Sequence, residues 1–483
     1  MFATSPFLGS IIDAQTGREW SAQELHSAAA QRTSVLTAAG IGRDARVAIY
    51  HGGSAAFFAD LFAVWEIGAC AVCLNPGLTS EELANVSAFI EPAAILVGSG
   101  AATGLPASVR SFCLAEEVAK PRRGAAGPGA RLDDPALMLL TSGTTGTPKL
   151  VVHSFRSILA RVALNALFIG CADLARTLCV LPTHFGHGLI GNCLTPLLAG
   201  QTLVLAGGDG LSAARDVSRL IDQHAVTFLS SVPAFWKLAT RIAGSPTAGT
   251  LKRLHVGSAP LSSDLWRQVI EWSRTHNVVN MYGITETANW VAGASALDRE
   301  PQDGAIGTPW GGWTAIRRED GTIAAHGDGE LVVQGPSVMS GYYRRADLTE
   351  AVLADGWYRT GDTGHIDESG YAYLTGRRKF EINRAGIKVQ PEDIDLLIER
   401  HDSVREACAF GIPDKAAGET VAVAVCPNER ATFDIETLKK WCSERLTREK
   451  LPARWFVVDE IPKTDRGKIN RDIVAKHCLS LPN

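Results

Sequence analysis

Short apolar segments alternate with helical patterns through most of the chain, and this rhythm restricts the fold more than any other feature. Residues 45–50 (ARVAIY) predict a strand, 55–68 a helix, 69–75 the next strand and 93–98 the one after. Consecutive strands joined by helices pair in parallel, so the pattern predicts a parallel sheet covered by helices. The rhythm recurs at TLCVLP, QTLVLAGG, VTFLSSVP, LKRLHVGS and HNVVNMYG. Each strand ends in small or polar residues, at the sheet edge where α/β proteins bind ligands.

The pattern changes along the chain in a way that predicts two domains. From about residue 310 the segments are short strands and turns, which indicates a β-rich unit. After Gly376 a final stretch carries its own strands and the periodic helices PEDIDLLIERH and IETLKKWCSERL. We therefore expect an α/β fold: a large N-terminal domain of parallel-type sheets and helices over residues 1–376, with a β-rich subdomain at about 310–376, and a smaller mobile α+β domain over residues 377–483.

Composition argues against several classes of function. The formal net charge of −4 gives no electrostatic reason to bind nucleic acid or an anionic membrane. The N-terminus lacks the features of a signal peptide, and no apolar run is long enough to span a membrane. The Cys70–Cys73 pair has no second pair or Cys/His cluster beside it. We therefore expect buried free thiols rather than a metal or redox site, in a cytoplasmic protein.

The loop from Thr141 to Lys149 gives the strongest functional signal. It follows an apolar strand and has the sequence TSGTTGTPK. Glycines let backbone N–H groups turn toward an anion, hydroxyls add donors, and Lys149 adds a positive charge. This composition directly after a buried strand predicts a phosphate site rather than a flexible linker. A Walker A loop is excluded, because Gly143 and Gly146 have the wrong spacing and Leu150 follows the lysine.

The same loop closely resembles the signature of the adenylate-forming superfamily, which includes acyl-CoA synthetases, stand-alone and peptide-synthetase adenylation domains, and beetle luciferases. Further motifs of that superfamily follow in the expected order, among them NMYGITET at 280–287, WYRTGD at 357–362 and IPKTDRGKI at 461–469. The resemblance implies an ATP site in the N-terminal domain formed by Thr141, Ser142, Gly143, Thr144, Thr145, Gly146, Lys149, Gly257, Ser258, Ala259, Pro260, Asn280, Met281, Tyr282, Gly283 and Thr285.

Individual roles follow from the resemblance. Tyr282 would stack on adenine, Thr285 would touch the α-phosphate, and Glu286 would serve Mg²⁺. A carboxylate near a triphosphate makes sense only with a divalent cation between them. Asp362 would bind both ribose hydroxyls, and Arg377 would also reach the ribose.

The end of the chain supplies the mobile parts that the resemblance implies. Lys379 matches the hinge between the domains, and Lys468 matches a catalytic lysine that also contacts the nucleotide. Gly386 matches a segment that lines a tunnel for a pantetheine thiol. The run FEINR after the hinge departs from the usual acidic–aliphatic sequence, which leaves the hinge energetics open.

The implied reaction is ATP-dependent activation of a carboxylic acid as acyl-AMP with pyrophosphate release, followed by transfer to a thiol. The first step brings two anions together, so the site must neutralise charge. Lys149, Mg²⁺ on Glu286, and Lys468 are the expected neutralisers and the candidate catalytic set. The small domain would then rotate, so that Lys468 leaves and the segment with Gly386 enters.

The segment PTHFGHGL matches the block that begins the acyl pocket of the superfamily. It lacks the aspartate that holds the α-amine in amino-acid-activating members, which argues against α-amino acids. Trp236 and Trp290 favour a short, flat or aromatic acid if they close the pocket, but both could equally be core residues, and His187 could simply start a helix. The predicted acyl pocket comprises His184, Phe185, His187, Gly188, Trp236, Val256, Gly257 and Trp290.

Free coenzyme A is the expected acceptor, because the sequence ends soon after Lys468 without a fused carrier domain. A separate carrier protein with phosphopantetheine is the alternative within the superfamily. From other classes, a luciferase-type oxygenase and a non-catalytic relative stay open, although Lys149, Glu286, Asp362, Arg377 and Lys468 together speak against the latter. The identity of the acid and the oligomeric state are not determined by the sequence.

Overall fold

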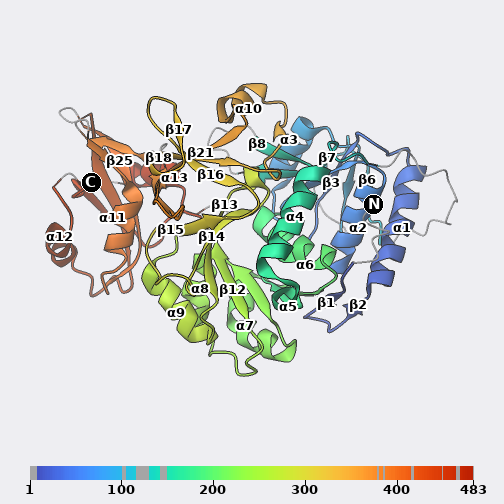
Figure 1. Cartoon of the computed structure of the whole chain (residues 1–483), viewed down its shortest axis with the longest axis horizontal. Coiled ribbons are helices and arrows are strands. Elements are labelled where there is room, and N and C mark those ends of the chain that lie inside the picture. Colours follow the sequence, from blue (N-terminus) through green and yellow to red (C-terminus); the bar gives the residue numbers. More distant parts are fainter. Residues whose placement is uncertain are drawn as a thin grey trace. The chain divides into compact units, whose positions relative to one another are not determined.

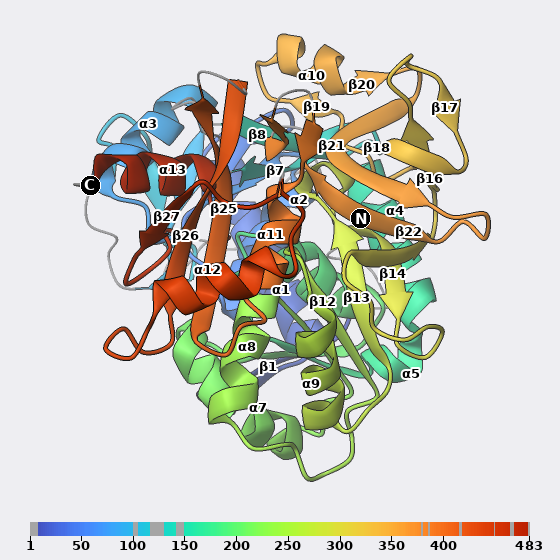
Figure 2. The same ribbon diagram turned by 90° about the vertical axis from the view of Figure 1, so that its left-hand side faces the viewer.

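The computed structural model describes residues 8–99, 105–115, 130–141, 149–377, 380–384, 387–414, 418–448, 450–463 and 468–481. The chain folds into two compact units. The N-terminal unit comprises residues 1–313 and 334–358, and the C-terminal unit comprises residues 314–333 and 359–483. The domain boundary expected at residue 377 stays a prediction. Figures 1 and 2 follow the chain through the elements of each unit.

One sheet of the N-terminal unit holds the strand that precedes the phosphate loop. Its order is β19-β8-β7-β4-β3-β5-β6. β7 pairs in parallel with β4 and antiparallel with β8, and Thr141 at the end of β7 lies opposite Lys149 at the start of β8. The strands are β3 (Arg46–Ile49), β4 (Cys70–Cys73), β5 (Ala94–Leu96), β6 (Ser111–Phe112), β7 (Pro135–Thr141), β8 (Lys149–Ser154) and β19 (Gly341–Tyr342).

A second sheet of this unit has the order β15-β14-β13-β12-β11-β9-β10-β1-β2. β11, β12 and β13 are parallel, and Ser231 lies opposite Val256, which lies opposite Asn280. The carboxyl ends of these strands therefore meet at one edge, as the sequence predicts. The strands are β1 (Ile11–Asp13), β2 (Glu19–Trp20), β9 (Arg176–Cys179), β10 (Thr202–Leu205), β11 (Phe228–Ser231), β12 (Arg253–Gly257), β13 (Val278–Gly283), β14 (Trp290–Ser295) and β15 (Ala305–Pro309). The short strand β20 (Leu353–Ala354) pairs with β21 (Trp357–Ile366).

Helices form the crossover connections of both sheets. α2 follows β3 and is mostly apolar, so nearly all of its residues are buried, and it packs against α1. α4 begins at Ser154, whose Oγ accepts a hydrogen bond from the Ser157 N–H at 3.2 Å. The helices are α1 (Ala22–Ala38), α2 (Ala55–Glu66), α3 (Ser80–Ile90), α4 (Phe155–Ile169), α5 (Cys171–Leu174), η1 (His187–Leu194), α6 (Thr195–Leu198), α7 (Gly210–Gln223), α8 (Pro233–Ile242), α9 (Ser263–Ser273), η2 (Thr285–Thr287) and α10 (Ala346–Val352).

The C-terminal unit contains two groups of strands. One has the order β17-β16-β18-β21-β22, and the other has the order β24-β23-β26-β25 with β27 beside β26. α11 and α12 cover one face of β25 and β26, and α13 covers the other (Figure 2). The elements are β16 (Trp313–Arg317), β17 (Ile323–Ala324), β18 (Gly327–Gln334), β21 (Trp357–Ile366), β22 (Ala372–Arg377), β23 (Ile382–Arg384), β24 (Ile387–Val389), α11 (Pro391–Ile398), β25 (Val404–Asp414), β26 (Gly418–Pro427), α12 (Ile435–Ser443), β27 (Arg454–Val457) and α13 (Arg471–Ser480).

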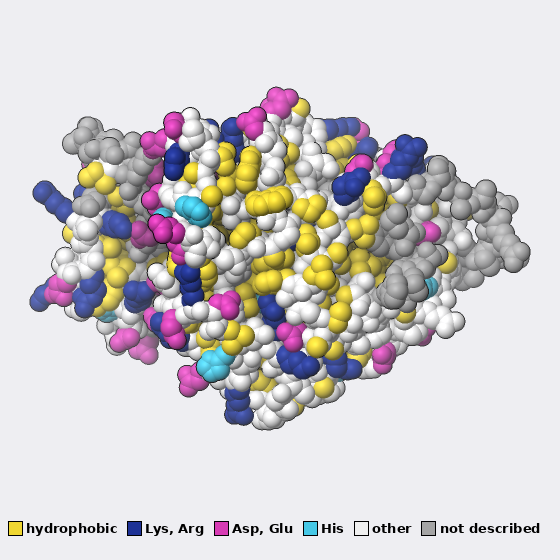
Figure 3. All heavy atoms as spheres, viewed as in Figure 1, with side chains coloured by type: hydrophobic (Ala, Val, Ile, Leu, Met, Phe, Trp, Pro, Cys, Tyr) yellow, Lys and Arg dark blue, Asp and Glu magenta, His cyan; other side chains and the backbone are white. Residues whose placement is uncertain are grey.

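Three features of composition have a visible structural counterpart. Cys70 and Cys73 belong to different core clusters, so their thiols face opposite sides of β4, and burial raises the pKa of Cys70 to about 12. No helix in the described part of the chain is long and apolar enough to cross a membrane. On the face shown in Figure 3, basic and acidic side chains are interspersed.

Candidate active site

A buried carboxylate contacts the start of β8, the strand that follows the predicted phosphate loop. Glu286 is in η2, and its Oε1 accepts hydrogen bonds from Lys149 Nζ at 3.4 Å and from the Tyr342 hydroxyl at 2.8 Å. Lys149 Nζ also lies 3.9 Å from the centroid of the Tyr342 ring. Lys149 begins β8 and Tyr342 ends β19, so two neighbouring strands hold the partners of this carboxylate. The structure thus brings together Lys149 and Glu286, two of the three predicted catalytic residues.

The donor set at Glu286 fits a magnesium ion that arrives with a nucleotide. Both contacts of its carboxylate are made by Oε1, and Oε2 has no hydrogen-bond partner among the described residues. Groups of three or more metal-ligating side chains do not occur in the described part of the chain. Mg²⁺ commonly binds through one or two carboxylates and substrate phosphates, so a single available carboxylate oxygen suits it.

His153 fixes the backbone beside this carboxylate. Its Nε2 lies 2.7 Å from the carbonyl oxygen of Thr285, and its Nδ1 lies 3.4 Å from the Ser157 hydroxyl. Burial lowers the pKa of His153 to about 4, against an opposing effect of the hydrogen bond to Thr285. The imidazole is therefore neutral at pH 7, with Nε2 as the donor to Thr285. β8 thus positions both sides of η2, through Lys149 and His153.

The predicted nucleotide residues of β13 lie at an irregular strand end. The pairing of β13 with β14 shifts register between Tyr282 and Gly283. A Cβ on Gly283 would lie 2.4 Å from the Asn289 carbonyl oxygen, so only glycine allows this close approach. Asn280 donates to the Ala305 carbonyl at 2.7 Å, and Met281 is buried in the core. Tyr282 is buried, and Thr285 is partly exposed beside Glu286.

His187 joins the two strand ends that flank the predicted acyl pocket. Its Nδ1 lies 2.9 Å from Ser258 Oγ and its Nε2 lies 2.7 Å from Ser230 Oγ. Ser258 follows β12 with φ at +72°, a strained conformation for a residue other than glycine that is often found at functional sites. Gly257 and Val256 are buried in β12, while Ala259 is partly exposed and Pro260 is exposed.

The helix that His187 begins is a π-helix, a rare form that often marks functional sites. His184 and Phe185 precede it as an edge-to-face pair with ring centroids 4.2 Å apart. Gly188 lies in its first turn, where a Cβ would approach the Pro182 carbonyl oxygen to 2.3 Å. The predicted start of a pocket therefore coincides with an unusual helix.

The two tryptophans of the predicted pocket have different surroundings. Trp236 on α8 is fully buried, with its ring centroid 5.2 Å from that of Trp272 on α9. Trp290 begins β14, and its ring lies edge-on to His187, with centroids 5.3 Å apart. Of the two, only Trp290 makes a ring contact with His187.

In the C-terminal unit, the predicted ribose residues form an ion pair. Asp362 is buried, and its Oδ1 lies 2.7 Å from Nε of the half-exposed Arg377. The residues come from the neighbouring strands β21 and β22, where they lie directly opposite each other. Lys468 is exposed, next to a short bridge between Lys463 and Ile469.

Several predicted residues lie outside the described residues: Ser142, Gly143, Thr144, Thr145 and Gly146 of the loop, Lys379 of the hinge, and Gly386 of the tunnel. Their roles stay predictions. For Thr141, which ends β7, the structure describes the backbone and not the side chain.

Sequence reasoning missed three buried polar residues that face the same region. Arg161 on α4 contacts Ser337, and Asn192 of η1 donates to the Ser230 carbonyl at 2.7 Å. His255 in β12 packs edge-on to Trp290, with centroids 5.0 Å apart, and burial lowers its pKa well below the ordinary value. Arg161 follows the buried Ile158 by three residues, a spacing that places both on one helix face, and this was the available signal for its burial.

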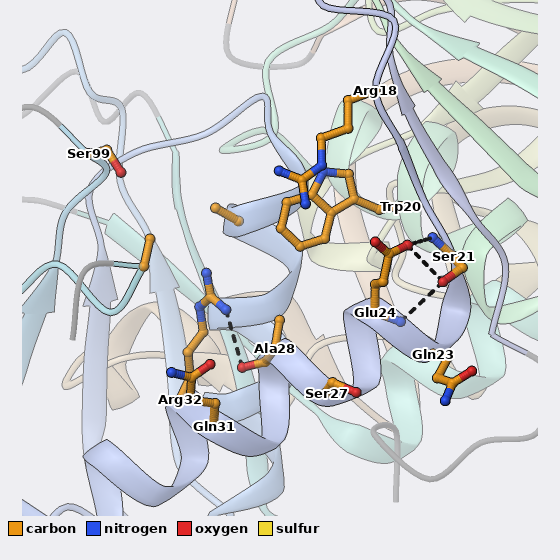
Figure 4. Close-up of a pocket in the computed structure, with 12 residues that line it drawn as sticks. Arg18, Trp20, Ser21, Gln23, Glu24, Ser27, Ala28, Gln31, Arg32 and Ser99 are labelled. Carbon is orange, nitrogen blue, oxygen red and sulfur yellow. Dashed lines mark hydrogen bonds between the residues drawn. The ribbon is translucent and has the colours of Figure 1, made fainter. Parts of the chain in front are cut away.

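A separate hollow of about 680 Å³ lies beside α1 (Figure 4). Arg18, Trp20, Glu24 and Arg32 line it. Glu24 closes the capping box of Ser21, and Arg32 pairs with the buried Asp60. These side chains serve structural contacts, so we do not assign the active site here.

The chain matches the AMP-binding enzyme family over residues 5–343 and the AMP-binding enzyme C-terminal domain over residues 393–468. The chain belongs to the AMP-binding enzyme family. The match over the first range includes the segments that hold Lys149, His187 and Glu286. The match over the second range ends at Lys468.

Individual AMP-binding enzymes support this membership. Sulfoacetate–CoA ligase of Cupriavidus necator is 35% identical over 73% of this chain and 69% of its own length. Oxalate–CoA ligase of Arabidopsis thaliana is 33% identical over 72% of this chain and 69% of its own. The structure of o-succinylbenzoate coenzyme A synthetase from Bacillus subtilis with ATP and magnesium has a TM-score of 0.88 at 26% identity, covering 98% of this chain and 97% of that one.

These likenesses confirm three expectations from the sequence: the superfamily, the α/β fold with a smaller C-terminal part, and an AMP-forming acid–thiol ligase as the class of enzyme. The roles of individual residues, including those of Lys468 and Asp362, stay predictions.

Proposed function

We propose that this AMP-binding enzyme activates a carboxylic acid with ATP and transfers the acyl group to coenzyme A. The observation that carries the proposal is the contact between Lys149, next to the phosphate loop, and the buried Glu286. A cation and a carboxylate placed together at the end of a phosphate loop suit a nucleotide that brings its own divalent ion. The names of the relatives, all CoA ligases or synthetases, support coenzyme A as the acceptor.

In the first step a carboxylate oxygen of the acid forms a bond to the α-phosphorus of ATP, and the bond to the pyrophosphate oxygen breaks. Lys149 would neutralise phosphate charge, and the neutral His153 would keep the Thr285–Glu286 segment rigid through the Thr285 carbonyl. Mg²⁺, when bound through Glu286, supplies further positive charge to the phosphates. Lys468, as the resemblance implies, would bridge the acid and the phosphate.

In the second step the sulfur of coenzyme A forms a bond to the acyl carbon, and the bond to the AMP oxygen breaks. The thiol proton is lost to solvent, and AMP leaves as a stable anion. Arg377 and Asp362 would hold the ribose through both steps. Their ion pair at 2.7 Å keeps the carboxylate oriented toward hydroxyl donors before the nucleotide binds.

Which carboxylic acid the enzyme accepts depends on the residues that line the acyl pocket and not on membership of the family. The relatives are named for oxalate, sulfoacetate and o-succinylbenzoate, which differ in length and shape. In this chain, η1, Ser230, Ser258 and Trp290 would form the wall around the acyl group. A cytoplasmic location also stays a prediction.

The decisive experiment is a panel of carboxylic acids incubated with ATP and Mg²⁺, with pyrophosphate release as the rate signal and product masses measured directly. Each acid is tested with coenzyme A, with a phosphopantetheine carrier protein, and with neither. We expect acyl-AMP without an acceptor and acyl-CoA with coenzyme A. Thioester formation only on the carrier protein would replace coenzyme A as the acceptor. Absence of pyrophosphate release over a broad panel would contradict the proposal.

A further inference from the structure

Arg161 is a buried cation without an acidic partner. The residue is 1% exposed on α4, and its Nε and Nη2 donate to Ser337 Oγ at 3.1 Å and 2.5 Å. Its Nη1 has no hydrogen-bond partner, and no acidic side chain among the described residues forms an ion pair with it. Burial lowers the pKa of the guanidinium to about 9, so Arg161 remains charged at neutral pH. A desolvated charge of this kind is costly unless an anion meets it.

Arg161 is connected through its neighbours to the backbone around Glu286. Its partner Ser337 is two residues from Met339, whose N–H donates to the Glu286 carbonyl oxygen at 2.8 Å. One turn before Arg161 on the same helix, Ser157 contacts His153. His153 in turn forms a hydrogen bond with the carbonyl oxygen of Thr285. The side chain of Arg161 therefore points into the protein, toward the segment around η2, and not into solvent.

The other end of the same helix face meets the predicted acyl pocket. Asn165, one turn after Arg161, donates to Thr195 Oγ1 at 3.4 Å, directly after η1. α4 also packs against η1, and its residues Ala166 and Phe168 contact the cluster that includes Trp290. Along α4, Arg161 thus lies between the part of the helix that contacts the neighbours of η2 and the part that contacts η1.

A second buried donor in this region also has no partner. Trp290 is 3% exposed, and its Nε1–H makes no hydrogen bond among the described residues. Buried polar groups in proteins are nearly always satisfied, yet Nη1 of Arg161 and Nε1 of Trp290 have no hydrogen-bond partner among the described residues. The buried amide oxygens of Asn165 and Asn192 also have none. An oxyanion is the acceptor that a guanidinium binds best, because its planar N–H groups match two oxygens.

We propose that Arg161 binds a second anionic group of the acyl substrate, so that the enzyme selects acids that carry a carboxylate or sulfonate in addition to the carboxylate it activates. The proposal rests on the proposed function and narrows its substrate class. The activated carboxylate would meet ATP, and the second anion would meet Arg161 at the far end of the acyl group. An ordered water on Nη1, with no role in selectivity, is the competing explanation.

The test compares wild type with Arg161→Met and Arg161→Lys on matched acids. Dicarboxylates from malonate to adipate, and sulfoacetate, are each paired with the monocarboxylate of equal carbon number. For at least one pair we expect wild type to favour the dianion by about tenfold or more in kcat/KM, the scale of one charged hydrogen bond. Arg161→Met should abolish that preference and change kcat/KM for the monocarboxylate by less than about threefold. Arg161→Lys should retain part of the preference for the dianion, because an ammonium group keeps the positive charge but lacks the paired N–H donors of a guanidinium.

Two controls separate this role from a structural one. Arg156→Met alters an exposed arginine on the same helix, paired with Asp133, and should leave selectivity unchanged. Arg161→Met removes a desolvated charge, so its Tm should equal or exceed that of wild type. The preferred dianion should raise the Tm of wild type and not that of Arg161→Met.

Equal preference of wild type and Arg161→Met for the dianions would overturn the proposal, as would a wild type that favours the monocarboxylate in every pair. The thermal-shift comparison requires no catalysis. If no acid released pyrophosphate, the proposed function would fail, while a dianion-dependent Tm shift that needs Arg161 would still support the binding site. Absence of that shift with every dianion would count against Arg161 whatever the activity.

Discussion

At the scale of single residues, the charge on Glu286 matters more than its shape. Lys149 and Tyr342 both approach one oxygen of the carboxylate, which leaves Oε2 for a cation. Substituting Gln at this position keeps the size and one acceptor oxygen but removes the charge. The two possible roles of Glu286, packing and cation binding, can therefore be separated by mutation.

We expect Glu286→Gln to lower kcat/KM for pyrophosphate release by about 100-fold, the scale for removing one preorganised charge from a reaction site. It should also raise the Mg²⁺ concentration needed for half-maximal rate. Tyr342→Phe is the matched control, since it removes a hydrogen bond to Oε1 and keeps the charge; its loss should stay below about tenfold. An unchanged Mg²⁺ dependence in Glu286→Gln would contradict the assignment.

His153 makes the stability of the protein depend on pH. Burial lowers its pKa from 6.5 to about 4, so between these values the unfolded chain binds a proton that the native state excludes. The stability linked to His153 is fully present above pH 6.5 and is lost progressively toward pH 4, by up to about 3 kcal/mol.

In His153→Gln the amide can still donate to Thr285, but it does not titrate. We expect its free energy of unfolding, measured by urea denaturation from pH 4.5 to 8, to fall less steeply below pH 6.5 than that of wild type. Parallel curves for the two proteins would show that His153 is already accessible to protons in the native state.

At the scale of elements, the short η1 helix depends on contacts to strands that lie far away in the sequence. His187 ties it to Ser230 at the end of β11 and to Ser258 after β12, and Asn192 adds a bond to the Ser230 carbonyl. A π-helix is intrinsically unfavourable, so these side-chain bonds help to hold its geometry. The wall of the predicted acyl pocket should be sensitive to their loss.

We expect His187→Phe, which keeps a ring and removes both hydrogen bonds, to raise KM for the acid by about tenfold. KM for ATP should stay within about twofold, because the Lys149–Glu286 contact does not involve this ring. Ser230→Ala should have a smaller effect, and the double variant should be no worse than His187→Phe, since both changes remove one shared contact. Equal increases in both KM values would indicate a general loss of structure instead.

At the scale of the whole molecule, the two half-reactions should depend on different parts of the chain. Lys468 is exposed in the C-terminal unit, whereas Lys149 and Glu286 belong to the N-terminal unit. The resemblance implies a mobile C-terminal domain, and a lysine needed for only one half-reaction is the expected sign of such alternation.

We expect Lys468→Ala to abolish acyl-AMP formation while largely sparing thioester formation from supplied acyl-AMP and coenzyme A. Lys476→Ala, an exposed lysine on α13 of the same unit, is the control and should leave both rates unchanged. The measurements are pyrophosphate release for the first step and acyl-CoA mass for the second. Equal loss of both half-reactions would refute a two-state role for Lys468.

The fold was accessible from the sequence because its signals are local. The strand predicted at 45–50 is β3 (Arg46–Ile49), and the helix predicted after Ser154 is α4. Alternation and capping depend on neighbouring residues, so each element can be inferred without its partners. The phosphate loop and the Tyr282–Glu286 motif were predicted for the same reason, and their roles stay predictions.

The sequence by itself determined the family and the α/β fold, and it predicted the main site residues. Only the tertiary structure decided that His187 bridges two serines, that Glu286 keeps one oxygen open, and that Arg161 is buried. An arginine in a helix is usually a solvated charge, and nothing within its own segment reveals what its guanidinium will meet. Partners such as Ser337 come from distant parts of the chain, so burial and unsatisfied hydrogen bonds emerge only once the elements have packed.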